Sequence, residues 1–295
     1  MADALIRPMT LADVPGAERL SSAAYYEVDL RTHQRDWPDP SPRPSHRAAL
    51  WRRRTEHLLG TDPGGCWVAE QDGELVGFAT ALTRELMWIL ASYAVLPGRQ
   101  GRGIGRALLD AALHHGRGCL RGMLNASADP RALRRYALAG FTLHPQLQLW
   151  GRVDRALLPV VEHVRDGTAA DRDLLDSLDR RTRGAAHGPD HAVLAQELRL
   201  IVTDRPAGSG YAYVNDAGAP VVLAASSRRA AASLMWEALA ATDPDEPVDI
   251  GHVSPANDWA VDVAMAARLG VWSRGFLALR GMKEPTPYIP HPTLL

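Results

Sequence analysis

The sequence predicts an α+β protein in which one arrangement of strands and helices occurs twice along 295 residues. A short motif at residues 7–13 recurs at residues 165–171, and a hairpin pattern recurs further along in the same order. A chain of this length can also form two domains of ordinary size. We therefore expect two tandem domains, residues 1–153 and 160–295, with the boundary between 151 and 159.

The recurring motif is a helix start. Each copy has an arginine, then a threonine, then an aspartate at the same spacing, and a helical pattern follows. A hydroxyl at the N-cap with an acid in the first turn is typical of a helix N-terminus. The two expected helices span residues 11–25 and 169–183. The motif residues are Arg7, Thr10 and Asp13 in the first copy and Arg165, Thr168 and Asp171 in the second.

The hairpins supply the second recurring landmark. Residues 67–80 and residues 211–225 each contain two short apolar runs around a polar turn with glycine, a pattern that indicates a β-hairpin. After its last helical pattern, each half has a glycine followed by a hydrophobic residue, at Gly140 and Gly270. We expect a closing hairpin at the end of each half.

Composition excludes several classes of function. The net charge is −1 with acids and bases interspersed, so we expect no nucleic-acid partner. No apolar run approaches the roughly 18 residues of a spanning helix, and the N-terminus lacks the features of a signal peptide, so we expect a cytoplasmic protein without a membrane partner. Cys66 and Cys119 cannot form a disulfide framework, and no Cys/His cluster has zinc spacing, so we expect no metal. A monomer and a homodimer both remain open.

The chemistry lies in a strand–loop–helix segment. Residues 87–96 are apolar without helical period, as in a buried central strand, and Pro97 ends them. A glycine-rich loop follows at residues 99–106 and leads into a helix with an apolar stripe. Glycines permit close backbone approach, and amide groups at a helix N-terminus attract anions. We expect a diphosphate-like ligand, with charge-assisted contacts from Arg102 and Arg106.

The glycine spacing narrows the choice of ligand. The loop lacks the Gly-x-x-x-x-Gly-Lys pattern of nucleotide triphosphate loops and the Gly-x-Gly-x-x-Gly pattern of dinucleotide sites. Gln100, Gly103 and Gly105 instead fit the pattern Gln/Arg-x-x-Gly-x-Gly/Ala. The segment resembles the coenzyme A pyrophosphate loop of the GNAT acetyltransferase family. Downstream, Asn125 and Tyr136 also match the family's layout near the thioester.

The resemblance implies a fold, a co-substrate and a mechanism. Each domain would be a mixed, mostly antiparallel twisted sheet flanked by helices, and acetyl-CoA would be the acetyl donor. An amine would attack the thioester directly, the amide of Val95 would donate to the acetyl oxygen, and Tyr136 would protonate the departing thiolate. The implied acetyl-CoA-binding residues are Ala94, Val95, Gln100, Gly101, Arg102, Gly103, Ile104, Gly105, Arg106, Asn125 and Tyr136.

The acceptor would be an amine of a small molecule or peptide. In the family the first helices build much of the acceptor pocket, and here that segment is both polar and aromatic. The expected acceptor-binding residues are Tyr25, Tyr26, Asp29 and His33. The general base stays open among Glu85, Glu27, Asp29 and His33.

The second half lacks the features that carry this chemistry. Residues 226–233 contain no glycine where the cofactor loop should recur, and Ala266 stands where a counterpart of Tyr136 would be. We expect a degenerate, non-catalytic domain with a proline-rich tail at residues 284–295. A non-catalytic acyl-CoA sensor and a different acyl donor, such as propionyl- or succinyl-CoA, are the alternatives.

Overall fold

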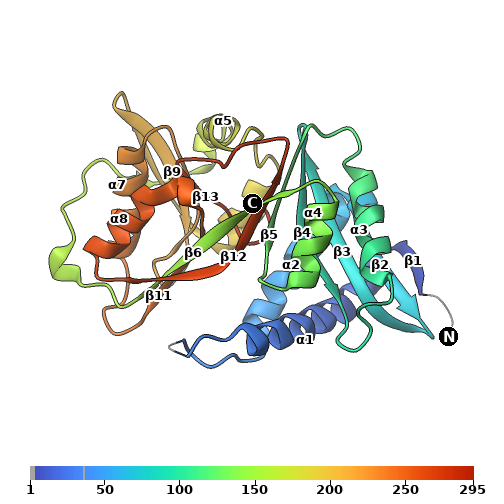
Figure 1. The fold of residues 1–295 in the computed structure, drawn as a ribbon. Helices are drawn as coiled ribbons and strands as arrows, with labels where there is room; N and C mark the ends of the chain where they lie inside the picture. The colour runs from blue at the N-terminus through green and yellow to red at the C-terminus, as the bar shows by residue number, and fades with distance from the viewer. Residues whose placement is uncertain (1–3, 36) are drawn as a thin grey trace. The chain divides into compact units, whose positions relative to one another are not determined.

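The computed structural model describes residues 4–35 and 37–295, and it is α+β as predicted (Figure 1). The chain divides into two compact units. The first unit holds the described residues up to Leu120 together with Ser127–Arg135, and the second holds Arg121–Ala126 and Tyr136–Leu295. The start of the N-terminal segment, residues 1–3, on which the expectation of no signal peptide partly rests, lies outside the described residues.

The first unit has four antiparallel strands in the order β1-β2-β3-β4. Their bounds are β1 Leu5–Pro8, β2 Cys66–Gln71, β3 Glu74–Arg84 and β4 Met87–Val95. Its helices are α1 Val14–Thr32, α2 Ser45–Thr61 and α3 Ile104–His115, with short 3-10 turns η1 Leu11–Asp13 and η2 Pro63–Gly65. The hairpin expected at residues 67–80 is confirmed, and the helix expected at residues 11–25 continues to Thr32.

Helices cover the central strands of this unit. β3 and β4 are buried along most of their length, in agreement with their apolar sequence. α3 packs along β2 and β3 (Figure 1), and Trp51 of α2 meets Phe78 of β3 edge to face at 5.5 Å. Burial of such side chains contributes about 1.5–3 kcal/mol each. This packing holds β4 and α3, the two elements that flank the glycine-rich loop.

The second unit contains two groups of paired strands. One has the order β5-β12-β6-β11 and the other is a five-stranded antiparallel sheet in the order β13-β10-β9-β8-β7. Their bounds are β5 Arg121–Ala126, β6 Thr142–Gly151, β7 Arg165–Asp166, β8 Arg199–Arg205, β9 Gly208–Val214, β10 Pro220–Ala225, β11 Val248–Val253, β12 Gly270–Arg280 and β13 Tyr288–Ile289. The predicted hairpin at residues 211–225 is confirmed as β9 and β10. In element order its counterpart is the β3–β4 hairpin that precedes α3, and not the hairpin at residues 67–80 with which the sequence pattern paired it.

The helices of this unit pack on the five-stranded sheet and on each other. α7 lies against β9 and β10 and beside α8 (Figure 1), and α5 packs on β9 and β10. A continuous apolar cluster, with Leu223, Leu234 and Trp259 among its members, joins the sheet to α7 and α8. The bounds are α5 Arg172–Thr182, α6 Asp190–Glu197, α7 Arg228–Ala240 and α8 Asp258–Ala266, with turns η3 Arg155–Leu157, η4 Ala169–Asp171 and η5 Pro255–Asn257. The remaining helix, α4 Pro130–Leu138, is divided, with residues 130–135 in the first unit and residues 136–138 in the second.

The predicted helix starts form the same structure in both halves. Arg7 donates two hydrogen bonds of 2.9 Å to the carboxylate of Asp13, and the backbone amide of Thr10 donates to Asp13 at 2.8 Å. In the second half Asp171 accepts from the guanidinium of Arg165 and, at 2.8 Å, from the amide of the preceding threonine, Thr168. Capping boxes are present at both sites. The recurrence in the sequence is therefore a recurrence in structure.

The expected closing hairpins are wrong. β6, the last strand of the first half, pairs with β12 and β11 of the second half, and β12 in turn pairs with β5 of the first half. The final strands of the two halves are thus exchanged, since β12 pairs with β5 of the first half and β6 pairs with β11 of the second half. Pairs such as Leu149 with Val271 and Leu124 with Ala278 bury apolar side chains along this seam. The strands on either side of the expected boundary at residue 153 are therefore hydrogen-bonded to one another.

Helices long and apolar enough to cross a membrane are absent from the parts of the chain that the structure describes.

Candidate acetyl-CoA site

The glycine-rich loop connects the end of β4 to the start of α3. Gly98, Gly101 and Gly103 have φ angles of +78°, +81° and +87°, which side chains rarely adopt. Gly103 is the N-cap of α3, and no side chain accepts a hydrogen bond from the first turn of the helix. A Cβ at Gly101 or Gly103 would meet nothing within 4 Å. The loop therefore leaves the amide groups at this helix N-terminus to an outside acceptor, as an anion site requires.

The side chains of the loop divide into anchors and exposed charges. Gln100 donates from Nε2 to the carbonyl of Val95 at 3.1 Å and so ties the loop back to the end of β4. Ile104 is 7% exposed and anchors α3 in the core, so only its backbone amide can face a ligand. Arg102 and Arg106 are exposed, and Arg106 lies 3.5 Å from Asp110 on the same helix. Two cationic groups thus stand at the loop where phosphates would need them.

Gly105 is a glycine for a reason that the sequence did not reveal. A Cβ there would lie 2.4 Å from the hydroxyl oxygen of Tyr93 and 3.5 Å from the side chain of Val95. Burial raises the pKa of Tyr93 to about 12, so its phenol is neutral at physiological pH. The first turn of α3 therefore packs directly on β4 at this point, and Tyr93 is a residue of the site that sequence reasoning missed.

The end of β4 carries the predicted donor to the acetyl oxygen. Ala94 is 9% exposed, and Val95 pairs with Gly77 of β3. The pairing of β3 with β4 shifts by one residue, which leaves Ala91 without a partner across the pair. Such a bulge bends a strand and is common next to active sites.

The predicted acceptor residues lie on or just after α1, and one of them reaches β4. The hydroxyl of Tyr25 lies 3.5 Å from the carbonyl oxygen of Tyr93. Although 37% of Tyr25 is exposed, desolvation of its phenol raises its pKa. Tyr26 is half-buried, whereas Asp29 and His33 are exposed at the end of the helix. The structure thus brings Tyr25 to the strand that carries Val95 and leaves Asp29 and His33 on the surface.

One candidate for the general base is excluded by position. Glu85 lies in the turn that precedes β4, and the nine residues of β4 separate this turn from the end of the strand at Val95. At about 3.4 Å per residue the separation is roughly 30 Å. A carboxylate at that distance cannot accept the proton directly.

Asn125 and Tyr136 belong to the second compact unit, and their contact with the loop remains a prediction. The carboxamide of Asn125 accepts from Gln146 at 2.9 Å and donates to the carbonyl of His291 at 3.2 Å. Tyr136 is 5% exposed near the end of α4. The proline-rich tail is therefore a neighbour of Asn125, a relation for which the sequence has no signal.

The counterpart of the loop in the second half is closed. Ser227 is the N-cap of α7 and accepts a hydrogen bond from the amide of Ala230 at 3.2 Å. Ala225, the last residue of β10, donates its amide to the carbonyl of Pro287 at 3.2 Å, and β13 of the tail pairs with β10. The groups that would bind a ligand here are thus used within the chain.

Comparison with known proteins places the chain in a class. Residues 24–141 match the Acetyltransferase (GNAT) family, and this range contains the β3–β4 hairpin, the loop and Tyr136. Over this segment, which is less than half of the chain, the protein is similar to the GNAT acetyltransferase family.

A mycothiol acetyltransferase of Streptomyces griseus is 39% identical over 88 residues, which are 28% of this chain. The chain spans 29% of the length of that relative. Two solved structures match the fold along the chain. A candidate acetyltransferase from Pyrococcus horikoshii has a TM-score of 0.75 at 18% identity, over 100% of this chain and 96% of its own. A GCN5-related N-acetyltransferase from Sphaerobacter thermophilus has a TM-score of 0.59 at 15% identity, over 94% and 95%.

Proposed function

We propose that the protein transfers an acetyl group from acetyl-CoA to an amine of a small molecule or peptide. The observation that carries the proposal is the uncapped N-terminus of α3, entered through glycines with positive φ and flanked by Arg102 and Arg106. The similarity of residues 24–141 to the family supports the choice of acetyl-CoA as the anion. In this proposal residues 1–153 form the catalytic domain and residues 160–295 a degenerate, non-catalytic domain.

The chain's own groups would divide the work as follows. Backbone amides at residues 101–105 and the two arginines would hold the pyrophosphate, and the amide of Val95 would donate to the acetyl oxygen. The acceptor amine, positioned beside Tyr25, would attack the thioester carbon, and the C–S bond would break. Tyr136 would then give its phenolic proton to the departing thiolate, and the proton lost by the amine nitrogen would pass to solvent, from which the phenol regains its own. A neutral phenol suits this role because it can donate a proton, whereas phenylalanine cannot.

Substitution of Tyr136 by phenylalanine tests the assignment of the acid. Tyr136→Phe keeps the buried ring and removes only the hydroxyl, so we expect kcat to fall roughly 10- to 1000-fold with acetyl-CoA affinity nearly unchanged. The assay follows free thiol release with a panel of amines, and calorimetry measures acetyl-CoA binding. An unchanged kcat, with chemistry shown to limit the rate, would make Tyr136 a packing residue.

The same panel decides between transfer and sensing. Saturable acetyl-CoA binding by the wild-type protein, without thiol release for any amine, would contradict the proposal and favour the acyl-CoA sensor. The panel repeated with propionyl- and succinyl-CoA identifies the preferred donor.

A further inference from the structure

A buried cluster of histidines and aspartates lies in the second unit, within a stretch of 16 residues from Asp176 to His191. Asp176 and Asp179 are three residues apart on α5 and so share one face of the helix. His187 lies in the loop before α6, and His191 lies on α6. Asp179 and His187 are 0% exposed at their side chains and His191 is 3% exposed.

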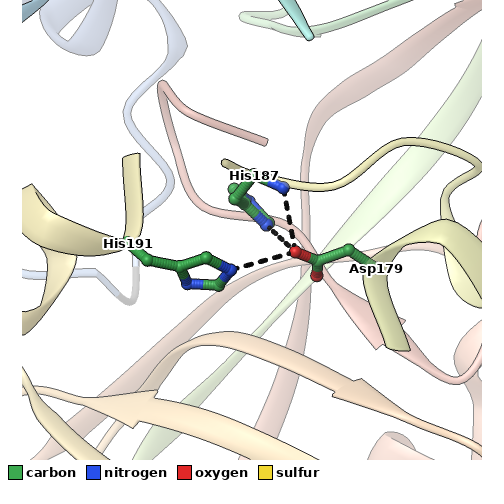
Figure 2. Close-up of side chains that lie close together, drawn as sticks. All are labelled: Asp179, His187 and His191. Atoms are coloured by element: carbon green, nitrogen blue, oxygen red, sulfur yellow. Dashed lines mark hydrogen bonds and ion pairs between the residues drawn. The ribbon is translucent and has the colours of Figure 1, made fainter. Parts of the chain in front are cut away.

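The donor atoms of these side chains converge. Figure 2 shows both imidazoles directed at the carboxylate of Asp179, with His187 Nδ1 at 2.7 Å and His191 Nε2 at 3.2 Å from Oδ2. His191 Nε2 also lies 3.4 Å from Oδ1 of Asp176. Tetrahedral zinc with bonds of about 2.0–2.2 Å holds its ligand atoms roughly 3.3–3.5 Å apart. Two of the three separations are therefore close to those of a zinc site, and the third needs a small outward movement.

Neighbouring groups orient the donors. The hydroxyl of Tyr211 donates to Oδ1 of Asp179 at 2.5 Å, and Oδ2, which faces the imidazoles, also accepts from the backbone amide of His187 at 3.0 Å. Tyr213, two residues further along the same face of β9, lies 3.1 Å from Nδ1 of His191, which directs Nε2 toward the carboxylates. Histidines and carboxylates that bind metals almost always have such partners on their other atoms.

We propose that Asp176, Asp179, His187 and His191 bind one divalent transition-metal ion, and that this ion is zinc. Nitrogen and oxygen donors of this kind suit zinc, and four protein ligands without an open position are typical of a structural site. Three of the four side chains are buried, and that of Asp176 is 18% exposed. The ion would connect α5 to α6. A zinc ion here would overturn the expectation of no metal, which was based on Cys/His spacing and did not consider a site with two aspartates.

The test uses the full chain and zinc itself. Protein purified with zinc and then dialysed against metal-free buffer is expected to retain about one zinc per chain by mass spectrometry. A strong chelator should then lower its melting temperature. Cobalt in place of zinc should produce the visible absorption of a tetrahedral site.

Variants separate a metal site from a hydrogen-bonded cluster. His191→Asn should reduce bound zinc to less than about a tenth, and Tyr213→Phe, which keeps all four ligands, should weaken zinc binding about tenfold. His144→Gln is the matched control, because His144 pairs with Glu284 at 2.9 Å in the same unit, outside the cluster, and should leave zinc bound.

Wild-type protein decides the question even if the variants fail to fold. Folded wild-type protein that holds no zinc, shows no cobalt bands and melts at the same temperature with and without chelator would overturn the proposal, and the cluster would then be a hydrogen-bonded network only.

Discussion

The starts of α3 and α7 follow equivalent hairpins, yet they treat their backbone amides in opposite ways. α3 begins at a glycine with φ of +87° and has no side-chain cap, whereas α7 begins at Ser227, whose hydroxyl accepts from Ala230. Glycine in place of a capping side chain costs only a few tenths of a kcal/mol, and the helix N-terminus can then bind an anion. The start of α3 therefore suits a ligand, whereas the start of α7 is satisfied by its own side chain.

The strand before α7 is also covered by the chain itself. β10 has its edge covered by β13, and its last amide is bonded to Pro287. The tail therefore occupies the edge of β10 in the second half. An edge that pairs with its own chain offers no amide to a ligand, which supports a non-catalytic second half.

The largest effect is expected from separating the halves. Residues 1–151 alone would lack β12, which lies between β5 and β6, so each of these strands would lose its pairing with β12. We expect this fragment to be insoluble or unfolded by circular dichroism. As a control, a protease site inserted at Val160, which is 93% exposed, allows cleavage of the folded chain, and the two pieces should elute together. A folded, monomeric 1–151 fragment would contradict the strand exchange.

The next largest effect is expected on acetyl-CoA affinity, compared between a variant at the start of α3 and a variant at the start of α7. Gly103→Val forces a side chain into a left-handed conformation at the cradle, so we expect acetyl-CoA affinity at least tenfold weaker, about 1.4 kcal/mol, by calorimetry. Ser227→Ala, at the equivalent cap of α7, should cost about 1 kcal/mol of stability and leave affinity unchanged. The wild-type chain should bind one acetyl-CoA, and a stoichiometry of two would show that the second half also binds.

Gly105 allows packing and binding to be distinguished. Gly105→Ala should destabilise the protein because its Cβ would lie 2.4 Å from the hydroxyl of Tyr93. The Tyr93→Phe substitution removes this hydroxyl, so the ring atom nearest to the new Cβ would be Cζ, at 3.5 Å. Stability should therefore recover in the double variant. If acetyl-CoA affinity stays low in the folded double variant, Gly105 also serves the ligand. Full recovery of affinity would make it a packing glycine only.

The smallest effect is expected on stability, when the arginine–aspartate pair at the start of each half is broken. The guanidinium of Arg7 and its hydrogen bonds lower the pKa of Asp13 to about 2, and Arg165 does the same for Asp171. An ionised carboxylate therefore stabilises the fold at neutral pH, and this contribution is lost as pH falls from about 4, the unfolded pKa, toward 2.

Asparagine at either position should cost at most about 1 kcal/mol at pH 7, because both sites are partly solvated. The larger loss is expected for Asp13→Asn, since Arg7 also pairs with Glu70 at 2.8 Å and is 30% exposed, against 52% for Arg165. Urea unfolding at pH 7 and pH 3 measures both differences. Equal differences at the two pH values would exclude an ionic origin.

Much of the candidate site could be predicted from sequence because it is local. Helix caps, the two confirmed hairpins and the loop before α3 depend on hydrogen bonds and dihedral angles within a few residues, which residue type controls directly. Gly103 and Gly101 belong to this group. Gly105 was also predicted, but its close contact with Tyr93 was not, since Tyr93 comes from a different element.

Features that join distant segments were decided only by the tertiary structure. The edges of β5 and β11 present similar apolar strands, and β6 and β12 can each satisfy the backbone of either edge, so local sequence has no preference between a closing hairpin and an exchange. The carboxylates and imidazoles at residues 176–191 became a cluster only when α5 and α6 packed against β9. The sequence determined which segments are strands, helices and anion-binding turns, and the packing of those segments determined their partners, because backbone hydrogen bonds and burial reward any complementary edge.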